Sequence, residues 1–212
     1  MKKQKLVIFS TIGLILLFLV GGYIYKDQQF AKAAAEINSH SSSLVREYSP
    51  KKGNENAKVV LVEFFDPACG TCAQFHPFVD DIMQKNEGKI KLVMRYAPFH
   101  NGARAVVKIL DAAKKQGRFW QTLDVVFKTQ SLWKTGMTAH SEKLWKYLPQ
   151  AGLDIDRLVK DLKDPKIDKH IDQDLADVKT LGVHQTPEFF VNGKPLKKFG
   201  YKELENLINS EL

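Results

Sequence analysis

The sequence predicts an α/β domain with an all-helical insertion, preceded by an N-terminal transmembrane helix. Three observations support this. Residues 6–25 contain no charged side chain, residues 59–97 read as strand, helix and strand, and residues 101–181 show helical patterns with almost no strand signal. A chain of 212 residues is long for one minimal domain and short for two large ones, which favours a single core carrying an insertion.

The N-terminal hydrophobic segment has the length of a membrane span. A helix needs about 20 apolar residues to cross the hydrocarbon layer, and residues 6–25 supply that number. Lysines precede the segment and few follow it, which predicts a cytoplasmic N-terminus and an exported remainder. We therefore expect residues 1–26 to form an uncleaved anchor. A cleaved signal peptide is the alternative, because small residues recur at 31–35; both readings deliver the domain to an oxidising compartment.

The charge of the chain gives no support for nucleic acid as a partner. The formal net charge is +8, but Lys2, Lys3, Lys5 and Lys26 flank the hydrophobic segment, and without them the remainder carries only +4. No basic run is interleaved with aromatic residues, as nucleic-acid surfaces usually require.

A polar region separates the anchor from the first clear strand. Residues 27–57 read as a stalk and a loop, with a short edge strand at 44–48. The run VVLVEFF at 59–65 is rich in β-branched and aromatic residues and has the length of a buried strand. Asp66-Pro67 ends it, so a strand stops just before the two cysteines.

A helix and a second strand follow. Apolar residues recur at helical spacing from Cys72 to Met83, and Pro77 is expected to kink this helix because proline lacks the amide hydrogen. KIKLVMRYA at 89–97 is the second strand. Two strands joined by a helix favour a parallel pair with a right-handed crossover.

The rest of the chain divides into helices and one hairpin. Helical patterns between 101 and 181 are interrupted at Gly117, Gly136, Gly152 and Pro165, and the last of these helices runs from 165 to 181. The strands 188–191 and 195–199 flank Asn192-Gly193, which favours a two-residue hairpin turn. An amphipathic helix from Tyr201 closes the domain.

The chemistry of the chain centres on its only two cysteines. Cys69 and Cys72 lie three residues apart where a strand meets a helix. The free amides and dipole of a helix N-terminus favour a thiolate, so Cys69 is expected to be the nucleophile. Cys72 lies one turn further along and deeper. It is therefore expected to resolve a mixed disulfide between Cys69 and a substrate.

Two other interpretations of the cysteines remain open. A purely structural disulfide closing so short a loop would contribute only about 2 kcal/mol. Metal binding would use Cys69, Cys72 and His76 as soft ligands for Cu(I) or Zn, but no second cysteine pair completes the set. We expect His76 to be a helix-face residue, and His100 and His184 to be loop residues rather than ligands or bases.

Two longer motifs make the interpretation more specific. VEFFDPACGTCAQFHP at 62–77 and GVHQTPEFFVNGKPL at 182–196 resemble the DsbA-like branch of the thioredoxin superfamily, and the likeness extends over about 48–212. It implies a thioredoxin fold for residues 58–212. It also implies a bacterial thiol-disulfide oxidoreductase on the outer side of the cell membrane, acting on exported cysteine-containing proteins, recycled by a membrane redox partner and needing no metal or organic cofactor.

The resemblance assigns roles to individual residues. Thr186-Pro187 matches the cis-proline site of the family, which packs beside the active-site disulfide and leaves the backbone of Thr186 free to pair with an extended substrate. Glu63 matches the acid beneath the disulfide that assists proton transfer at the deeper cysteine. Pro77 matches the kink proline.

One departure from the family affects the expected activity. The strongly oxidising members have Pro-His between the cysteines, whereas Gly70-Thr71 provides no imidazolium here. We therefore expect a less oxidising couple than DsbA. The alternatives are a reductase or isomerase dedicated to a few envelope proteins and a non-catalytic, membrane-tethered copper-binding module.

Overall fold

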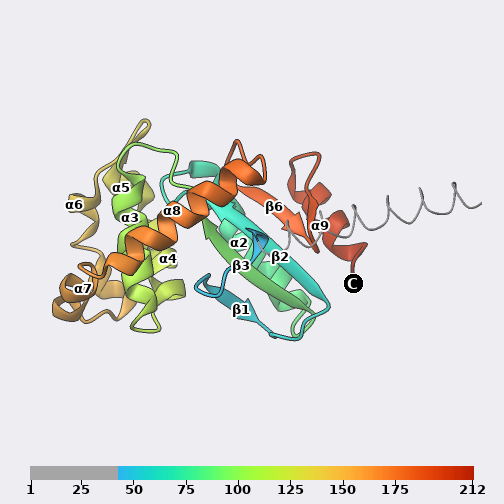
Figure 1. The fold of residues 1–212 in the computed structure, drawn as a ribbon, viewed down its shortest axis with the longest axis horizontal. Coiled ribbons are helices and arrows are strands. Elements are labelled where there is room, and N and C mark those ends of the chain that lie inside the picture. Colours follow the sequence, from blue (N-terminus) through green and yellow to red (C-terminus); the bar gives the residue numbers. More distant parts are fainter. Residues whose placement is uncertain (1–42) are drawn as a thin grey trace, which may run out of the picture. The chain divides into compact units, whose positions relative to one another are not determined.

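The computed structural model describes residues 43–212 (Figure 1). The predicted anchor at 1–26 and the stalk up to residue 42 lie outside the described residues. Within residues 43–212, no helix combines the length and apolarity that crossing a membrane requires.

The core of the domain is a five-stranded sheet with the order β1-β3-β2-β6-β7. The strands β2 and β3 are parallel and are joined by helix α2 (Gly70–Lys85), whereas every other pair is antiparallel. This arrangement confirms the predicted strand-helix-strand unit and the C-terminal hairpin. The strands are β1 (Lys51–Gly53), β2 (Val59–Phe65), β3 (Ile90–Tyr96), β6 (Glu188–Val191) and β7 (Lys194–Pro195).

Both faces of the sheet are covered. Alternate side chains of a strand point to opposite faces, and in β2 the residues Leu61 and Phe65 share one cluster with buried residues of α2 and of α9 (Tyr201–Asn209). Val62 and Phe64 belong to a second cluster with Val178 of α8 (Pro165–Thr180). Burial on both faces explains why β2 is apolar almost throughout.

The insertion lies at one end of the sheet, away from α9 (Figure 1). It is helical as predicted in most of its length, but it is not all-helical. The strands β4 (Lys134–Thr135) and β5 (Thr138–Ala139) form a small antiparallel pair, because Gly136 adopts a positive φ of 56° that permits a tight turn. Its helices before α8 are α3 (Ala103–Lys114), α4 (Phe119–Lys128), α5 (Gln130–Trp133), α6 (Ser141–Leu144), the 3₁₀ turn Leu148–Ala151 and α7 (Ile155–Asp161).

The predicted edge strand at 44–48 is wrong. The edge strand is β1, a few residues later, which pairs with β3 through Lys51–Gly53. Residues 44–48 instead pack by their side chains: Leu44 is buried in the second cluster, and the Tyr48 hydroxyl bonds to Asp174 at 2.5 Å. Polar residues at 51–53 fit an edge strand because one side of it faces solvent.

A buried ionic network joins this segment to β3 and α8. The Arg95 side chain is fully buried, and its Nη2 lies 2.8 Å from Asp174 Oδ1 and 2.6 Å from Asp177 Oδ2. Asp174 also accepts a hydrogen bond from the backbone amide of Tyr96 at 2.7 Å. Arg46 pairs with Asp177 from the other side. Every charge in the network has an opposite partner, as burial requires.

Candidate functional site

The turn before α2 is fixed by the buried carboxylate of Asp66. It accepts hydrogen bonds from the backbone amides of Ala68 and His100, both at 2.7 Å, and contacts His100 Nδ1 at 2.8 Å. The Asp66 carbonyl accepts from the amide of Cys69 at 3.0 Å. The sequence predicted Asp66-Pro67 as the end of a strand and His100 as a loop residue, but it did not predict the contact between Asp66 and His100. The Asp-Pro step directly before the cysteines was the available signal.

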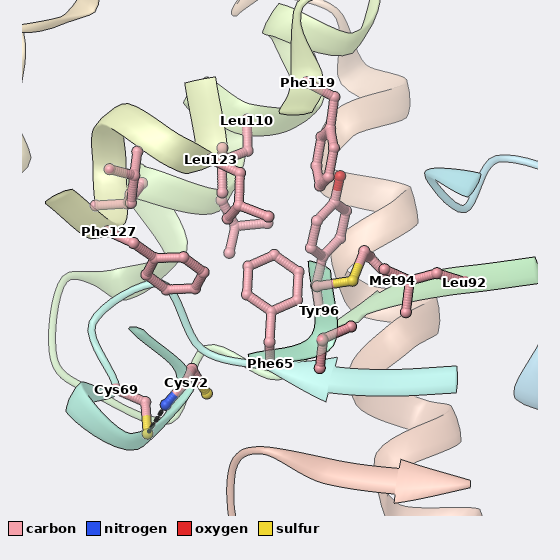
Figure 2. Close-up of a cluster of buried hydrophobic side chains, with 14 of the residues drawn as sticks. Phe65, Cys69, Cys72, Leu92, Met94, Tyr96, Leu110, Phe119, Leu123 and Phe127 are labelled. Carbon is pink, nitrogen blue, oxygen red and sulfur yellow. Dashed lines mark hydrogen bonds between the residues drawn. The ribbon is translucent and has the colours of Figure 1, made fainter. Parts of the chain in front are cut away.

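The two cysteines lie at the N-terminus of α2. Cys69 is the N-cap residue, and the backbone amide of Cys72 donates to its Sγ at 3.4 Å (Figure 2). Both are free thiols. The exposed fraction is 7% for Cys69 and 0% for Cys72. Cys69 is therefore the outer sulfur and Cys72 the deeper one.

The surroundings of Cys69 favour its ionised form. Interactions with the Cys72 and Thr186 side chains, together with hydrogen bonds from the amides of Cys72 and Thr71, lower the pKa of Cys69 to about 5 despite the opposing effect of burial. Negative charge on this sulfur is thus stabilised by donors at the start of a helix.

The alkylation rate of Cys69 is expected to rise with pH around a midpoint near its lowered pKa of about 5, rather than near the ordinary thiol value of about 8.5. The lowered pKa of Cys69 also stabilises the folded, reduced protein. This contribution is complete at pH values above the pKa of the thiol in the unfolded chain. That contribution is lost as the pH falls through the folded pKa. Iodoacetamide kinetics on the Cys72→Ser variant measure the midpoint, and a midpoint above pH 8 would contradict this assignment.

Cys72 and Glu63 have the opposite electrostatics. Burial, the Cys69 thiol and the Glu63 carboxylate together raise the pKa of Cys72 well above its usual range. Glu63 is 2% exposed, and burial, followed by the charges of Cys69 and Asp80, raises its pKa to about 8. Glu63 is therefore protonated near neutral pH. Its carboxyl group has the pKa that a proton donor and acceptor for a buried thiol needs.

The resemblance gives Glu63 the role of taking the proton of Cys72, which requires the ionised carboxylate. The Glu63→Gln variant is therefore expected to resolve mixed disulfides more slowly above pH 8, where wild-type Glu63 is ionised. A lost general base typically costs about 10²-fold or more in rate. Stopped-flow measurements of the resolution step against pH test this, and the wild-type inflection near pH 8 is expected to disappear. Unchanged rates across that range would remove Glu63 from the reaction.

A stability measurement tests the raised pKa of Glu63 independently of its role in the exchange reaction. Because the pKa of Glu63 in the folded protein lies above that of an exposed glutamate, its burial destabilises the wild type increasingly as the pH rises from the unfolded pKa to the folded one. The Glu63→Gln variant lacks this penalty. It is expected to be more stable than wild type at pH 8 and of similar stability at pH 4.

Thr186 and Pro187 lie beside the nucleophile. The Cys69 thiol donates to the Thr186 carbonyl at 3.1 Å, and the Thr186–Pro187 peptide bond is cis. Pro187 is buried, whereas Thr186 is partly exposed. The fold thus places Thr186 against the nucleophile, and Glu63 interacts electrostatically with both cysteines.

The other two histidines considered above, His76 and His184, occupy different surroundings from His100. His184 is exposed in the loop before β6. His76 faces α4, with Nε2 at 2.7 Å from Asp124 Oδ1 and 3.8 Å from Asp80 Oδ2. Lys52 pairs with Asp80 at 2.7 Å. The side chains of His76, Asp80 and Asp124 could present ligand atoms within 4.8 Å of one another, but Asp80 already pairs with Lys52 and Asp124 is bonded to His76. We therefore interpret the cluster as a network of polar side chains rather than a metal site.

Comparisons with known proteins agree with the sequence motifs. A family model described as thioredoxin matches residues 46–210. A thioredoxin-like oxidoreductase from Silicibacter pomeroyi DSS-3 superposes with a TM-score of 0.69 and 24% identity, covering 79% of this chain and 95% of its own. Oxidised BdbD from Bacillus subtilis superposes with a TM-score of 0.68 and 22% identity, covering 78% of this chain and 93% of BdbD. The thiol-disulfide exchange protein alpha-DsbA2 from Wolbachia pipientis superposes with a TM-score of 0.70 and 22% identity, covering 83% of this chain and 94% of alpha-DsbA2. The predicted thioredoxin fold is confirmed.

Sequence relatives are longer proteins. The Na(+)/H(+) antiporter NhaA of Herminiimonas arsenicoxydans is 34% identical over 146 residues, which are 69% of this chain and 22% of the antiporter. The Na(+)/H(+) antiporter NhaA 3 of Salinispora tropica is 30% identical over 146 residues, which are 68% of this chain and 21% of the antiporter. The chain thus spans about a fifth of the length of these curated relatives.

Proposed function

Because this chain belongs to the thioredoxin family, we propose that it is a DsbA-like thiol-disulfide oxidoreductase whose redox pair is Cys69 and Cys72. The opposite ionisation of the two thiols carries the proposal: the pKa of the outer Cys69 is lowered and that of the deeper Cys72 is raised. Such a pair gives one sulfur that attacks or leaves readily and a second that acts only when its proton is removed.

The exchange balances without a cofactor. During substrate oxidation, a substrate thiolate attacks Cys69 of the Cys69–Cys72 disulfide, and the sulfur of Cys72 leaves and takes a proton, which Glu63 can supply. The second substrate thiolate then attacks the substrate sulfur of the mixed disulfide, and Cys69 leaves as its stable thiolate. The substrate loses two electrons and the enzyme gains them. Reduction of a substrate disulfide is the reverse sequence.

The pKa of Cys69 indicates an intermediate redox potential. Nucleophilic cysteines have a pKa of about 7 in thioredoxin and about 3.5 in DsbA, and Cys69 at about 5 lies between them. A more stable thiolate makes the disulfide more oxidising. We therefore expect a potential between roughly −270 mV and roughly −120 mV, the thioredoxin and DsbA values. This range leaves a reductase or isomerase devoted to a few envelope proteins as the second candidate within the same chemistry.

We also propose where the enzyme works. The charge-free segment 6–25 would anchor it in the bacterial cell membrane as a single span, with the domain on the extracytoplasmic side. Its partners would be exported cysteine-containing proteins and a membrane redox protein that recycles the pair. Membrane fractionation tests the anchor, together with phosphatase fusions after residue 42. Release of the intact domain into the soluble fraction would contradict it.

Exchange with glutathione separates the enzyme from a copper-binding module that uses the same sulfurs. The proposed enzyme forms a mixed disulfide with oxidised glutathione and resolves it to an internal disulfide. Tight Cu(I) binding without any exchange would contradict the proposal and favour the module.

A further inference from the structure

We propose that Gln130 is a positioning residue for the Cys69 thiolate, supplied by the helical insertion to the turn that carries the nucleophile. Its side-chain amide nitrogen donates to the backbone carbonyls of Pro67 at 2.9 Å and of Cys69 at 3.0 Å. Pro67 lies in the turn between β2 and α2, and Cys69 is the N-cap of α2. The inference rests on the proposed function, in which Cys69 is the attacking sulfur.

The segment that carries Gln130 is held in place by hydrogen bonds to α4. Gln130 is the first residue of α5. On one side of it, the Thr129 hydroxyl donates to the Val125 carbonyl at 2.7 Å. On the other side, the fully buried Trp133 donates its indole hydrogen to the Val126 carbonyl at 3.1 Å. These bonds fasten α5 to α4, so the amide that reaches the turn is held by the core of the insertion.

The two bonds fix the directions of the peptide groups around the sulfur. A peptide unit is planar, so holding the Pro67 and Cys69 carbonyls also orients the amides that follow them. The Cys69 carbonyl accepts in addition from the Ala73 amide at 3.2 Å, which is the first bond of α2. The amides of Thr71 and Cys72, which stabilise the Cys69 thiolate, belong to this same first turn.

Gln130 also acts on the local charge. Carbonyl oxygens carry partial negative charge and oppose a thiolate nearby, and the amide hydrogens of Gln130 offset that charge on two of them. The side chain lies over the dipeptide between the cysteines, because a Cβ placed on Gly70 would meet Gln130 Oε1 at 3.9 Å. A neutral donor at this position therefore favours the thiolate, whereas a carboxylate there would disfavour it.

The Gln130→Met variant tests the inference, since methionine keeps the length and neutrality of the side chain but donates no hydrogen bond. The pH midpoint of the Cys69 thiolate, followed by its ultraviolet absorbance, is expected to rise. The equilibrium with glutathione is expected to shift toward the protein disulfide by roughly 3- to 10-fold, as the loss of one or two hydrogen bonds predicts. The two changes should agree in size, because both report the free energy of the same thiolate.

The Gln130→Glu variant supplies a second signature. At pH 7 its carboxylate opposes the thiolate, so the shift is expected in the same direction and to exceed that of Gln130→Met. At a pH where the new carboxyl is protonated, the difference between the two variants should disappear. A purely structural role would produce no such pH dependence, so this variant decides the question if Gln130→Met does not fold.

The Gln121→Met variant is the matched control, because Gln121 is exposed on α4. It is expected to stay within twofold of wild type in both measurements. A folded Gln130→Met protein that also stays within twofold would overturn the inference, even if its melting temperature fell. A wild-type protein that forms no Cys69–Cys72 disulfide with glutathione would instead overturn the proposed function.

Discussion

The Cys69→Ser variant is expected to lose all thiol-disulfide exchange, whereas the Cys72→Ser variant is expected to accumulate stable mixed disulfides. Cys69 carries the lowered pKa and lies at the outer end of the pair, so in the proposed mechanism it is the sulfur that attacks a substrate. Cys72 is fully buried, and without it nothing inside the protein can attack the Cys69–substrate bond. The two single variants therefore have opposite products, although each removes one sulfur.

Mass spectrometry after reaction with oxidised glutathione distinguishes these products. The Cys72→Ser protein should carry one glutathione, and the Cys69→Ser protein should carry none on the time scale on which the wild type reacts. Equal labelling of the two variants would show that the sulfurs are not ordered as we describe. The Cys69→Ser protein should be less stable than the reduced wild type at neutral pH, because it lacks the thiolate whose lowered pKa stabilises the fold.

The Asp174→Ala variant is expected to lose about 3–5 kcal/mol of stability, the cost of leaving one partner of a buried ion pair uncompensated. The Arg95 guanidinium is fully buried and depends on Asp174 and Asp177. Asp174 is also bonded to the Tyr48 hydroxyl and the Tyr96 amide. Because whole domains are stable by only about 5–15 kcal/mol, this single substitution should remove a large part of the total.

Urea unfolding of the reduced protein measures this loss. Asp172→Ala is the matched control, because Asp172 lies on the same helix but forms only a surface ion pair with Arg104, and such pairs are worth about 0–1 kcal/mol. If the two aspartate variants unfold at the same urea concentration, the buried network does not stabilise the fold as the geometry indicates.

Much of the fold and of the redox pair follows from local sequence patterns. The strand 59–65 was predicted with its observed bounds, because a short, continuous run of β-branched and aromatic residues strongly favours a buried strand. Asn192-Gly193 predicted the position of the hairpin, because this dipeptide favours a tight turn, and both residues have positive φ in the structure. Cys69 and Cys72 were predicted as nucleophile and deeper thiol because helix geometry alone fixes their order.

Tertiary contacts explain what the sequence did not predict. Residues 44–48 have the composition of a strand, but Leu44 and Tyr48 contact α8, which lies far away in the sequence. Gln130 lies in a short polar run about sixty positions after the cysteines, and nothing near it in the sequence points to the turn that it contacts. Polar residues of this kind are recognised only when the fold brings their partners together.

A redox titration of the pair against glutathione tests the central claim most directly. Wild-type protein is equilibrated over a range of reduced-to-oxidised glutathione ratios, quenched with acid and alkylated, and the fraction with both thiols free is measured. We predict a single two-electron transition between Cys69–Cys72 dithiol and disulfide, with a midpoint between roughly −270 mV and roughly −120 mV. Two cysteines that stay unlinked at every ratio would contradict the account.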